Sequence, residues 1–594
     1  FPRSEYILTR PSVERGNAMT YEKGIPDYAM VPAKEMEERV IVPITKGAIY
    51  SPVQVTNITE KPKTTITLEE DILVPDTKPD LREILMIDGK SHLAVKEIDA
   101  VVKGDDYINL SGEIELQTLY LPEKQEGNLP VISVQTRVPF KDQWHTSMSA
   151  GATMVLDCSV EKIEYMVINE RKYRVKVILA IMAREYTDAK VDLFEGLVDE
   201  DIQVLKETVE ISNVALRKKD TLSIKEDILP KEDSHPESIL KQDINVVENY
   251  KQISGDKVVI NGFVYVNLLY FSSASPVMPL QTAASDDTHA EGDPGKTGSS
   301  VLGDSCSIDS IHQLQERVEF TQFIPIQQGE RQSGCNICFD DSQLRVKLTQ
   351  DEDGADVFRL EGELLTYLEL YKNMEKEIIV DGYHRQKDFV CDFEEKSSRT
   401  LIGTSSGESS VREIISLENT GCDADRIVYT TAEVLSCESH CEQGKIVTEG
   451  VILVKMICSC EQEERGVFAV REEIPYRIVT AMPQLTGGEI ITQKVYIKDL
   501  WAEKINGKQI EFNATIMVCA EIMRPTPFKV LTNPAFEEPG SGCQVPPMVV
   551  YICRKTDTLW QIAKRFKTTT ASVREVNELE TDDLSEGQKL LIIK

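Results

Sequence analysis

One motif in the 594-residue chain has the residue types of a phosphate-binding loop. Residues 290–297 place a Gly, a second Gly and a Lys-Thr pair at relaxed P-loop spacing. Such a loop binds phosphate when a strand precedes it and a helix follows, because backbone amides then converge on the anion. Here polar residues precede the motif, a Gly-Ser-Ser sequence follows, and acidic neighbours would repel a nucleotide. We therefore expect no nucleotide site.

A second motif, residues 403–407, matches the Gly-x-Ser-x-Gly nucleophile turn of hydrolases. That turn joins a buried strand to a long helix, and an acid and a His follow later in the chain. Only His440 follows here, and the surrounding segment is rich in Ser. The sequence therefore predicts a loop without a catalytic role.

Five soft metal ligands form the third candidate: Cys437, His440, Cys441, Cys458 and Cys460. On neighbouring strands they could hold a tetrahedral zinc ion, or two of the cysteines could form a cross-strand disulfide. The Cys458 position is occupied by Tyr in two sister repeats described below, so filling of the core suffices to explain it. We predict buried core thiols, with metal ligation as the alternative.

Composition excludes several classes of function. Hydrophobic residues make up 41% and charged residues 28% of the chain, which is ordinary for a globular protein of about four domains. The formal net charge of −33 argues against nucleic acid or anionic lipid as the principal partner. No apolar run approaches the 18 residues expected of a membrane span. The odd count of 13 cysteines favours a reducing compartment.

A three-fold repeat is the clearest internal signal. A Gly followed by an alternating strand recurs at residues 111–120, 261–270 and 449–458. A second block ending in an aromatic residue follows each copy, at residues 138–140, 318–320 and 474–476. The second copy carries about thirty extra residues, which fits insertion in an exposed loop. Residues 272–307 are rich in Ser, Gly, Asp and Thr, and we predict a disordered insertion there.

The dominant period of two predicts antiparallel strands with one exposed face, hence a mainly β protein. We expect three tandem β-sandwich-like repeats followed by a small domain. The predicted divisions are an N-terminal arm or linker (1–46), three repeats (47–197, 198–385 and 386–535), a linker (536–547) and a C-terminal domain (548–594).

The C-terminal domain has a different pattern, a short βααβ unit. Residues 558–566 place Leu559, Ile562, Ala563 and Phe566 on one helical face. A second helix is expected over 570–577 and a closing strand over 589–593. This domain carries 8 basic and 7 acidic residues, so its net charge is +1 against the acidic remainder of the chain.

The same domain resembles the LysM family in three motifs: Asp557-Thr558-Leu559, Asn577-Glu578-Leu579 and Gly587-Gln588-Lys589-Leu590. It departs from the family pattern at Thr556, where Gly is usual, and at Glu586, where Pro is usual. The resemblance implies a groove that binds N-acetylglucosamine glycans, formed by Thr556, Asp557, Thr558, Leu559, Asn577, Leu579 and Gly587. The alternative is that these residues only cap helices and fill the core, with Asp557 as an N-cap.

The repeats together with this domain resemble the SPOCS-domain proteins of spore-forming Firmicutes. The first repeat carries the resemblance best, in residues 73–85 and in the strand after Gly112. The resemblance implies an adaptor of the developing spore coat, at the forespore surface in the mother-cell cytoplasm. It also implies that the LysM domain binds an ATP-hydrolysing coat basement-layer protein (SpoIVA-like) in place of glycan.

The sequence therefore favours a non-enzymatic adaptor that needs no cofactor. A second hypothesis is an envelope or extracellular protein whose LysM groove holds peptidoglycan. A third is a self-assembling fibre or shell subunit, a homo-oligomer in which residues 1–46 supply a strand to a neighbour. A hydrolase ranks last because no catalytic constellation has the required context.

Overall fold

The computed structural model describes residues 41–44, 47–99, 107–124, 129–198, 202–232, 234–273, 308–327, 333–460, 466–537 and 547–593. These residues are mainly β, as predicted, with two α-helices confined to the C-terminal domain. The two single-turn 3₁₀ segments are η1 (Ile308–Ser310) and η2 (Glu418–Thr420). Neither α-helix approaches the length or apolar character of a membrane span, and this holds for the described residues as a whole.

Three units each combine a three-stranded antiparallel sheet with a sheet that contains two long strands. In the first unit, the three-stranded sheet contains β3 (Leu81–Leu93), β5 (Ile108–Pro122) and β6 (Ile132–Trp144). Its second sheet contains β2 (Ala48–Leu73), β8 (Lys172–Leu197), β7 (Thr153–Asn169) and β4 (Glu97–Asp99), and the other two units are given below in the same order. The second contains β10 (His235–Ser254), β11 (Lys257–Ser273), β12 (Ile311–Pro325), and β9 (Ile202–Ile228), β15 (Asp356–His384), β13 (Gly334–Asp340), β14 (Arg345–Gln350). The third contains β17 (Ala424–Glu442), β18 (Lys445–Cys460), β19 (Val467–Ala481), and β16 (Asp388–Ser416), β21 (Gln509–Glu537), β20 (Ile490–Asn506), β1 (Ile41–Pro43).

Alternation along the strands places one face of each sheet in a core between the two sheets. In β8, Tyr173, Val175, Val177, Leu179 and Ile181 are buried at every second position. They pack against residues of β5 and β6 in one cluster, and the other two units have corresponding clusters. Period-two alternation therefore yields sandwiches because the apolar side chains of each strand gather on the face that meets the other sheet.

The repeated Gly and the repeated aromatic residue of the sequence are partners across neighbouring strands. Gly112 lies opposite Phe140, and the other two units repeat this pairing with Gly262–Phe320 and Gly450–Tyr476. A Cβ on Gly112 would lie 2.2 Å from the carbonyl oxygen of His92 and 2.7 Å from the Phe140 ring. Glycine is required because the aromatic ring occupies the space that a side chain would need.

The three units meet around one shared apolar core. Leu119 of β5, Leu269 of β11 and Ile457 of β18 each lie seven residues after the repeat Gly, and all three are buried in this core. The units are therefore packed side by side around a common axis. The sequence predicted their order along the chain but carried no signal for this arrangement.

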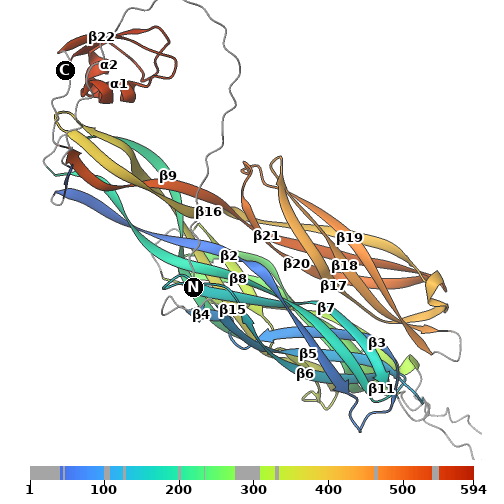
Figure 1. Ribbon diagram of the computed structural model, residues 1–594. Helices are drawn as coiled ribbons and strands as arrows, with labels where there is room; N and C mark the ends of the chain where they lie inside the picture. The colour runs from blue at the N-terminus through green and yellow to red at the C-terminus, as the bar shows by residue number, and fades with distance from the viewer. Residues whose placement is uncertain are drawn as a thin grey trace, which may run out of the picture.

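The long strands continue beyond the sandwiches into a stalk. Figure 1 shows β9, β16 and β21 running away from the three-stranded sheets toward the C-terminal domain. Along the stalk, side chains of all three units form small cores, one of which contains Phe194, Ile379 and Leu531. We call the far end of the stalk the stalk tip. It consists of the turn between β15 and β16, residues 385–387, and the ends of the two strands that flank this turn.

Three predicted segments fall largely outside the described residues. Of the N-terminal arm, Ile41–Pro43 form β1 and pair with Ala535–Glu537 of β21 in the same chain. Of the predicted insertion, Ser272 and Ser273 belong to β11, and residues 274–307 lie outside the described residues. The first two residues of the predicted linker belong to β21, and residues 538–546 lie outside as well. The predicted divisions between repeats stay a prediction.

A buried ionic cluster lies beside the shared core. Lys241 of β10 has no solvent exposure, and its ammonium group contacts Asp243 and lies 2.9 Å from Asp88 of β3. Lys455 of β18 approaches the same Asp88 at 2.6 Å and Glu433 at 2.7 Å. One carboxylate of the first unit therefore binds cations of both other units, and a buried charge is stable only when paired in this way.

Substitution of Asp88 tests this cluster. Asp88→Asn removes the anion that Lys241 and Lys455 share, so we expect the free energy of unfolding to fall by about 3 kcal/mol. Denaturant unfolding of the full chain measures the change. The control is Asp192→Asn on β8, an exposed carboxylate whose loss should cost under about 0.5 kcal/mol. Equal effects of the two substitutions would remove the cluster from the stability argument.

The natural chain and Asp88→Asn should differ in the pH dependence of their stability. Burial alone would raise the pKa of Asp88, but Lys241 and Lys455 outweigh burial and lower the pKa from 3.8 to about 2. A carboxyl group with a lowered pKa contributes its stability above the unfolded value and loses it as pH falls through the folded value. The natural chain should therefore lose stability between about pH 4 and pH 2 through this group, whereas Asp88→Asn lacks that component.

Candidate functional site

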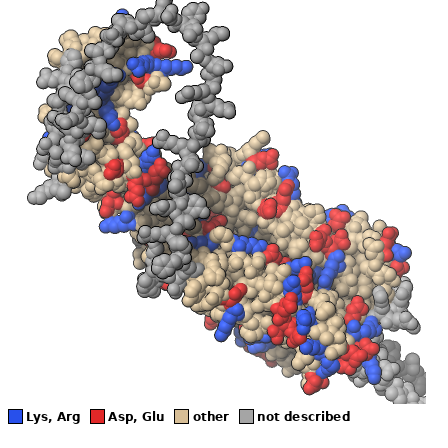
Figure 2. Space-filling view, viewed as in Figure 1, with Lys and Arg blue, Asp and Glu red and all other residues tan. Residues whose placement is uncertain are grey.

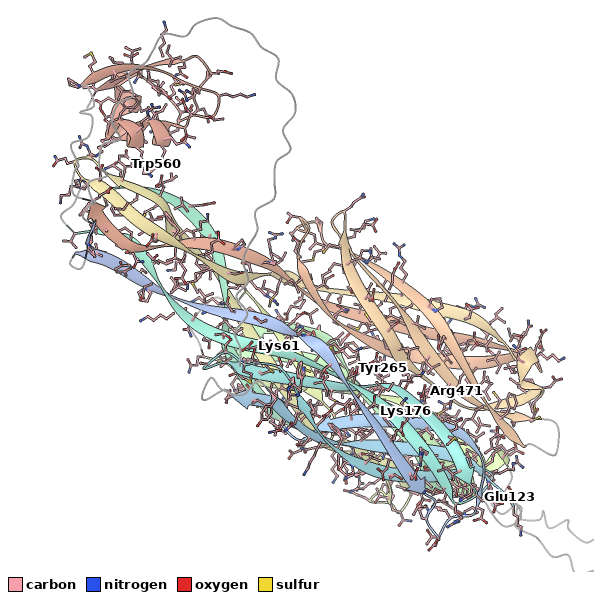
Figure 3. The ribbon with its side chains drawn as sticks, in the orientation of Figure 1. Lys61, Glu123, Lys176, Tyr265, Arg471 and Trp560 are labelled. Atoms are coloured by element: carbon pink, nitrogen blue, oxygen red, sulfur yellow. The ribbon has the colours of Figure 1, made fainter. Side chains whose placement is uncertain are left out.

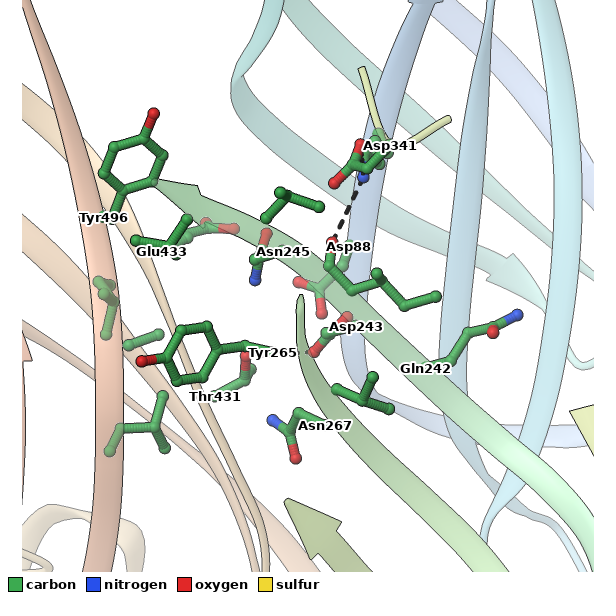
Figure 4. Close-up of a pocket in the computed structure, with 18 of the residues that line it drawn as sticks. Asp88, Gln242, Asp243, Asn245, Tyr265, Asn267, Asp341, Thr431, Glu433 and Tyr496 are labelled. Atoms are coloured by element: carbon green, nitrogen blue, oxygen red, sulfur yellow. Dashed lines mark hydrogen bonds and ion pairs between the residues drawn. The ribbon is translucent and has the colours of Figure 1, made fainter. Parts of the chain in front are cut away.

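A charged chamber of about 1040 Å³ lies between the three units, next to the ionic cluster. Figure 4 shows its lining, to which Asp88, Asp243 and Thr431 contribute from β3, β10 and β17. Tyr265 of β11 and Tyr496 of β20 line it as well. A cavity of this size is large enough for a ligand. Whether its charged side chains are free or already paired with one another distinguishes a ligand site from a contact between units.

Several charged side chains of the chamber are paired with one another. Lys90 pairs with Asp341 at 2.6 Å, and Arg345 pairs with Glu115 at 3.0 Å. Both pairs join the first unit to the second, as the ionic cluster does. Among the described residues, no three His, Cys, Asp or Glu side chains gather as a metal site. We therefore interpret the chamber as part of the packing between units.

The predicted soft-ligand set is not assembled. Cys437 pairs in register with Gly450 of β18, which is eight residues, or about 26 Å along a strand, from Cys458. His440 and Cys441 lie still farther along β17 from that end. Cys458 is fully buried in the core of the third unit, and burial raises the pKa of its thiol to about 12. Cys458 thus agrees with the core interpretation, whereas Cys437, Cys441 and Cys460 are only half-buried.

The two remaining motifs give no catalytic geometry. Residues 403–407 lie inside the 29-residue strand β16, paired with β21, so the predicted loop is wrong. The five residues lie in extended backbone, and the same strand continues to Ser416, so the helix that a nucleophile turn requires does not begin after them. The phosphate-loop-like residues 290–297 lie outside the described residues.

The C-terminal domain has the predicted βααβ order: β22 (Met548–Ile552), α1 (Leu559–Phe566), α2 (Thr570–Val576) and β23 (Lys589–Ile593). Thr558 is the N-cap of α1, and its hydroxyl accepts a hydrogen bond from the Gln561 amide at 3.2 Å. The assignment of Asp557 as N-cap was wrong by one residue. Asp557 instead accepts hydrogen bonds from the Arg554 amide at 2.8 Å and the Tyr551 hydroxyl at 2.7 Å, and these lower its pKa.

Besides Asp557 and Thr558, three more of the seven predicted groove residues have structural roles. Leu559 is 1% exposed in the domain core, and Leu579 packs against that core. The Asn577 amide donates to the carbonyls of Val573 at 2.8 Å and Leu591 at 2.7 Å, and its oxygen accepts from the Leu591 amide at 2.6 Å. Asn577 therefore ties the end of α2 to β23, and its side chain is fully engaged.

The exposed groove residues are Thr556, Thr558 and Gly587. Gly587 has φ of +83°, a conformation that favours glycine, and its amide donates to the carbonyl of Cys553 at 2.8 Å. The amide of Cys553 in turn donates to the carbonyl of Gln588 at 2.9 Å. The two groove loops are thus joined to each other, with Arg554 and Lys555 exposed on the first loop and acidic side chains on the second.

Helix α1 fastens the C-terminal domain to the stalk tip. The Trp560 indole donates to Asp381 of β15 at 2.8 Å, and Lys564 pairs with the same carboxylate. Tyr383 is 5% exposed, belongs to the core of the C-terminal domain, and has its ring 5.0 Å from that of Trp560. Figure 3 shows Trp560 at the junction between the domain and the stalk tip.

Two further bonds complete this junction. Lys567 pairs with Asp388 of β16 at 2.6 Å, and the Tyr383 hydroxyl donates to the Thr568 carbonyl. One signal in the sequence pointed to the junction, because Trp560 lies off the apolar face of α1. The stalk residues of the junction, Asp381, Tyr383 and Asp388, lie about 180 residues away along the chain, and no sequence motif marks them.

Comparison with protein families yields two matches. Residues 236–348 match the family described as SipL, SPOCS domain, and residues 551–592 match the LysM domain. Searches of curated proteins and of solved structures found no match. The chain thus carries a SPOCS domain and a LysM domain, as the resemblance implied. The SPOCS match lies on the second unit, whereas the motif was most legible in the first.

The two matched domains are binding modules, and neither indicates an enzymatic family. Together they fit a sporulation protein associated with the spore coat that carries a module of the peptidoglycan-binding type. Figure 2 shows acidic and basic side chains interspersed over the face in view, without a single-sign patch along the units. The LysM domain is therefore the strongest candidate for specific recognition.

The junction can be tested by Asp381→Ala. This change removes the acceptor of the Trp560 indole and the partner of Lys564, and hydrogen bonds to charged groups are worth about 1.5–3 kcal/mol. We expect the Trp560 indole NMR resonance to shift and narrow as the LysM domain moves independently of the stalk. Asp353→Ala, an exposed carboxylate in the β14–β15 turn, is the matched control. An unchanged resonance in Asp381→Ala would contradict the junction.

The structural role of Asn577 gives a second prediction. Asn577→Ala removes three hydrogen bonds worth about 1 kcal/mol each, so the LysM domain should be less stable by about 2–3 kcal/mol. Faster hydrogen exchange of the α1 amides in the full chain measures this loss. Glu580→Ala on the exposed neighbouring loop should leave exchange unchanged. If Asn577 served only a ligand, its removal would not alter exchange in the free protein.

Proposed function

From a chain that carries a SPOCS domain and a LysM domain, we propose a non-enzymatic adaptor of spore-coat assembly. The three β units serve as a rigid body, and the LysM domain docks onto a protein of the coat basement layer. The resemblance supports a SpoIVA-like ATP-hydrolysing partner and a location at the forespore surface in the mother-cell cytoplasm. Protonated core thiols such as Cys458 are compatible with that reducing compartment.

The observation that carries this proposal is the position of the LysM domain. It lies at the end of the stalk, fastened there by Trp560 and Tyr383 (Figure 1). The groove loops and the outer side of its sheet remain exposed, as Thr556, Gly587 and Val550 illustrate. A recognition module held at a fixed orientation loses less freedom on binding than one on a flexible tether.

Charge distribution supports recognition through the LysM domain. The whole chain has a net charge of −33, whereas residues 548–594 carry a net charge of +1. An acidic body repels anionic surfaces in general, and a near-neutral module avoids that repulsion where contact is wanted. The three units thereby limit unspecific adhesion.

The LysM match also favours a second candidate function, binding of peptidoglycan in the groove. Thr558 and Gly587 keep their exposed positions there. Thr556 and Glu586 stand where the family has Gly and Pro, and both side chains are exposed at the groove loops. The Thr side chain at 556 is larger than the usual Gly and narrows the access of a glycan to the backbone of the groove. We therefore rank binding of a protein partner ahead of binding of peptidoglycan.

Localisation tests the adaptor function. A tagged full chain should encircle the forespore during sporulation, and a chain without residues 548–594 should be dispersed, because recognition depends on the LysM domain. Fluorescence microscopy of both chains measures this. A diffuse signal from the intact chain would count against the proposal.

Pull-down experiments separate the two candidate functions. The adaptor predicts retention of the full chain on purified basement-layer protein and little retention on purified peptidoglycan. The glycan hypothesis predicts the reverse. Thr556→Gly, which restores the family residue, should increase peptidoglycan retention if Thr556 narrows the groove.

A further inference from the structure

The outer face of the LysM sheet is unusually apolar for an exposed surface. In β22 and β23, residues paired in register share a face, and the outer face consists of Met548 with Ile593, Val550 with Leu591, and Ile552 with Lys589. Met548, Val550 and Ile552 are 61%, 64% and 58% exposed. Single exposed apolar residues are common, but a contiguous set on one small sheet marks a contact surface.

Two other surfaces of the LysM domain are already in use. The inner face of the sheet, with Leu590 and Ile592, packs against α1 in the domain core. Helix α1 is occupied on its outer side by the stalk tip through Trp560 and Lys564. The outer face of the sheet is thus left open opposite the helices, and β22 pairs with β23 alone among the described strands.

Charge at one end of this face narrows the choice of occupant. Lys589 lies on the face itself opposite Ile552, and exposed Arg554 follows two residues after Ile552. The register places no carboxylate among the six side chains of the outer face, in a chain that otherwise carries a large acidic excess. An apolar segment with acidic residues at one end complements both the aliphatic side chains and the positive end of this surface.

The chemistry of the face also excludes glycan as its natural ligand. Aliphatic side chains offer neither hydrogen-bond donors for sugar hydroxyls nor aromatic rings for stacking. An extended peptide, by contrast, could bury Val550 and its apolar neighbours on the face. Its backbone could also form hydrogen bonds with the free edge of β22.

We propose that the outer face, Met548, Val550, Ile552, Leu591, Ile593 and Lys589, docks an extended apolar segment of a protein partner that ends in acidic side chains. This inference rests on the proposed function and assigns its protein contact to the face of the sheet rather than to the glycan-type groove. The groove and the outer face then serve different ligand classes within one small domain.

Val550→Glu in the full chain tests the proposal. A carboxylate at the centre of the face opposes both apolar contact and the acidic segment, so the dissociation constant for purified basement-layer protein should rise at least about tenfold. The matched control is Val479→Glu on β19, a 48% exposed Val on a body strand, which should change affinity less than about twofold. An unchanged Trp560 indole resonance verifies that the domain stays folded and docked.

Lys589→Glu probes the charge component separately. It should weaken binding by about threefold to tenfold and flatten the salt dependence of affinity, because one attractive pair becomes repulsive. Thr556→Gly in the groove should leave protein binding unchanged.

Several outcomes would overturn the inference. Suppose that Val550→Glu binds the basement-layer protein as the natural chain does, while removal of residues 548–594 abolishes binding. The outer face would then not be the docking site, and the adaptor function would stand. No effect of removing 548–594 would refute the adaptor function itself. Dissociation of a dimer by Val550→Glu in sedimentation velocity would assign the face to a second copy. Protection of β22 amides that disappears on removal of residues 1–40 would assign it to the chain's own arm.

Discussion

The arrangement of the whole molecule depends on the pairing of Lys241. Its ammonium group is fully buried at the meeting point of the three units, in contact with Asp243 and Asp88. Burial would lower the pKa of this group, but the two carboxylates outweigh burial and raise the pKa well above its usual value. A lysine left charged and unpaired there would cost several kcal/mol. The units can therefore pack only where β3 delivers a carboxylate to β10, which selects one arrangement among the many that apolar contact alone allows.

Divergence between the repeats makes this pairing possible. Asp88 and Asp243 occupy equivalent positions opposite the fifth residue after the repeat Gly, and the third unit has Thr431 there. Three identical units around one axis would place three carboxylates together, which repel one another. Lys241 stands where the other units have Met86 and Tyr429, Lys455 stands where they have Gln117 and Asn267, and both supply the missing positive charge. The shared strand pattern thus gives the sandwich, and the residues that differ between the units give its mode of assembly.

The stalk transmits this order to the recognition module. Small cores drawn from all three units, such as Phe194 with Ile379 and Leu531, hold the long strands together along its length. At its end, Tyr383 enters the LysM core and Asp381 binds α1, so the LysM domain takes its orientation from the body. The position of Trp560 off the apolar helix face is explained by this contact. A module docked in this way presents its groove loops and its outer sheet face to partners while its helices are engaged.

The sequence by itself determined most of what depends on near neighbours. Alternation predicted the strands, the Gly and aromatic blocks marked the units because each Gly lies directly under its ring, and the LysM motifs predicted βααβ to within a residue or two. It failed where the deciding partner lies far along the chain. Residues 403–407 read as a loop because their neighbours are small and polar, yet pairing with β21 makes them a strand. The ionic cluster, the stalk and the Asp381–Trp560 junction join residues more than a hundred positions apart. Such contacts leave no periodic trace, since a lone Lys or Asp reads as surface until folding removes water from around it.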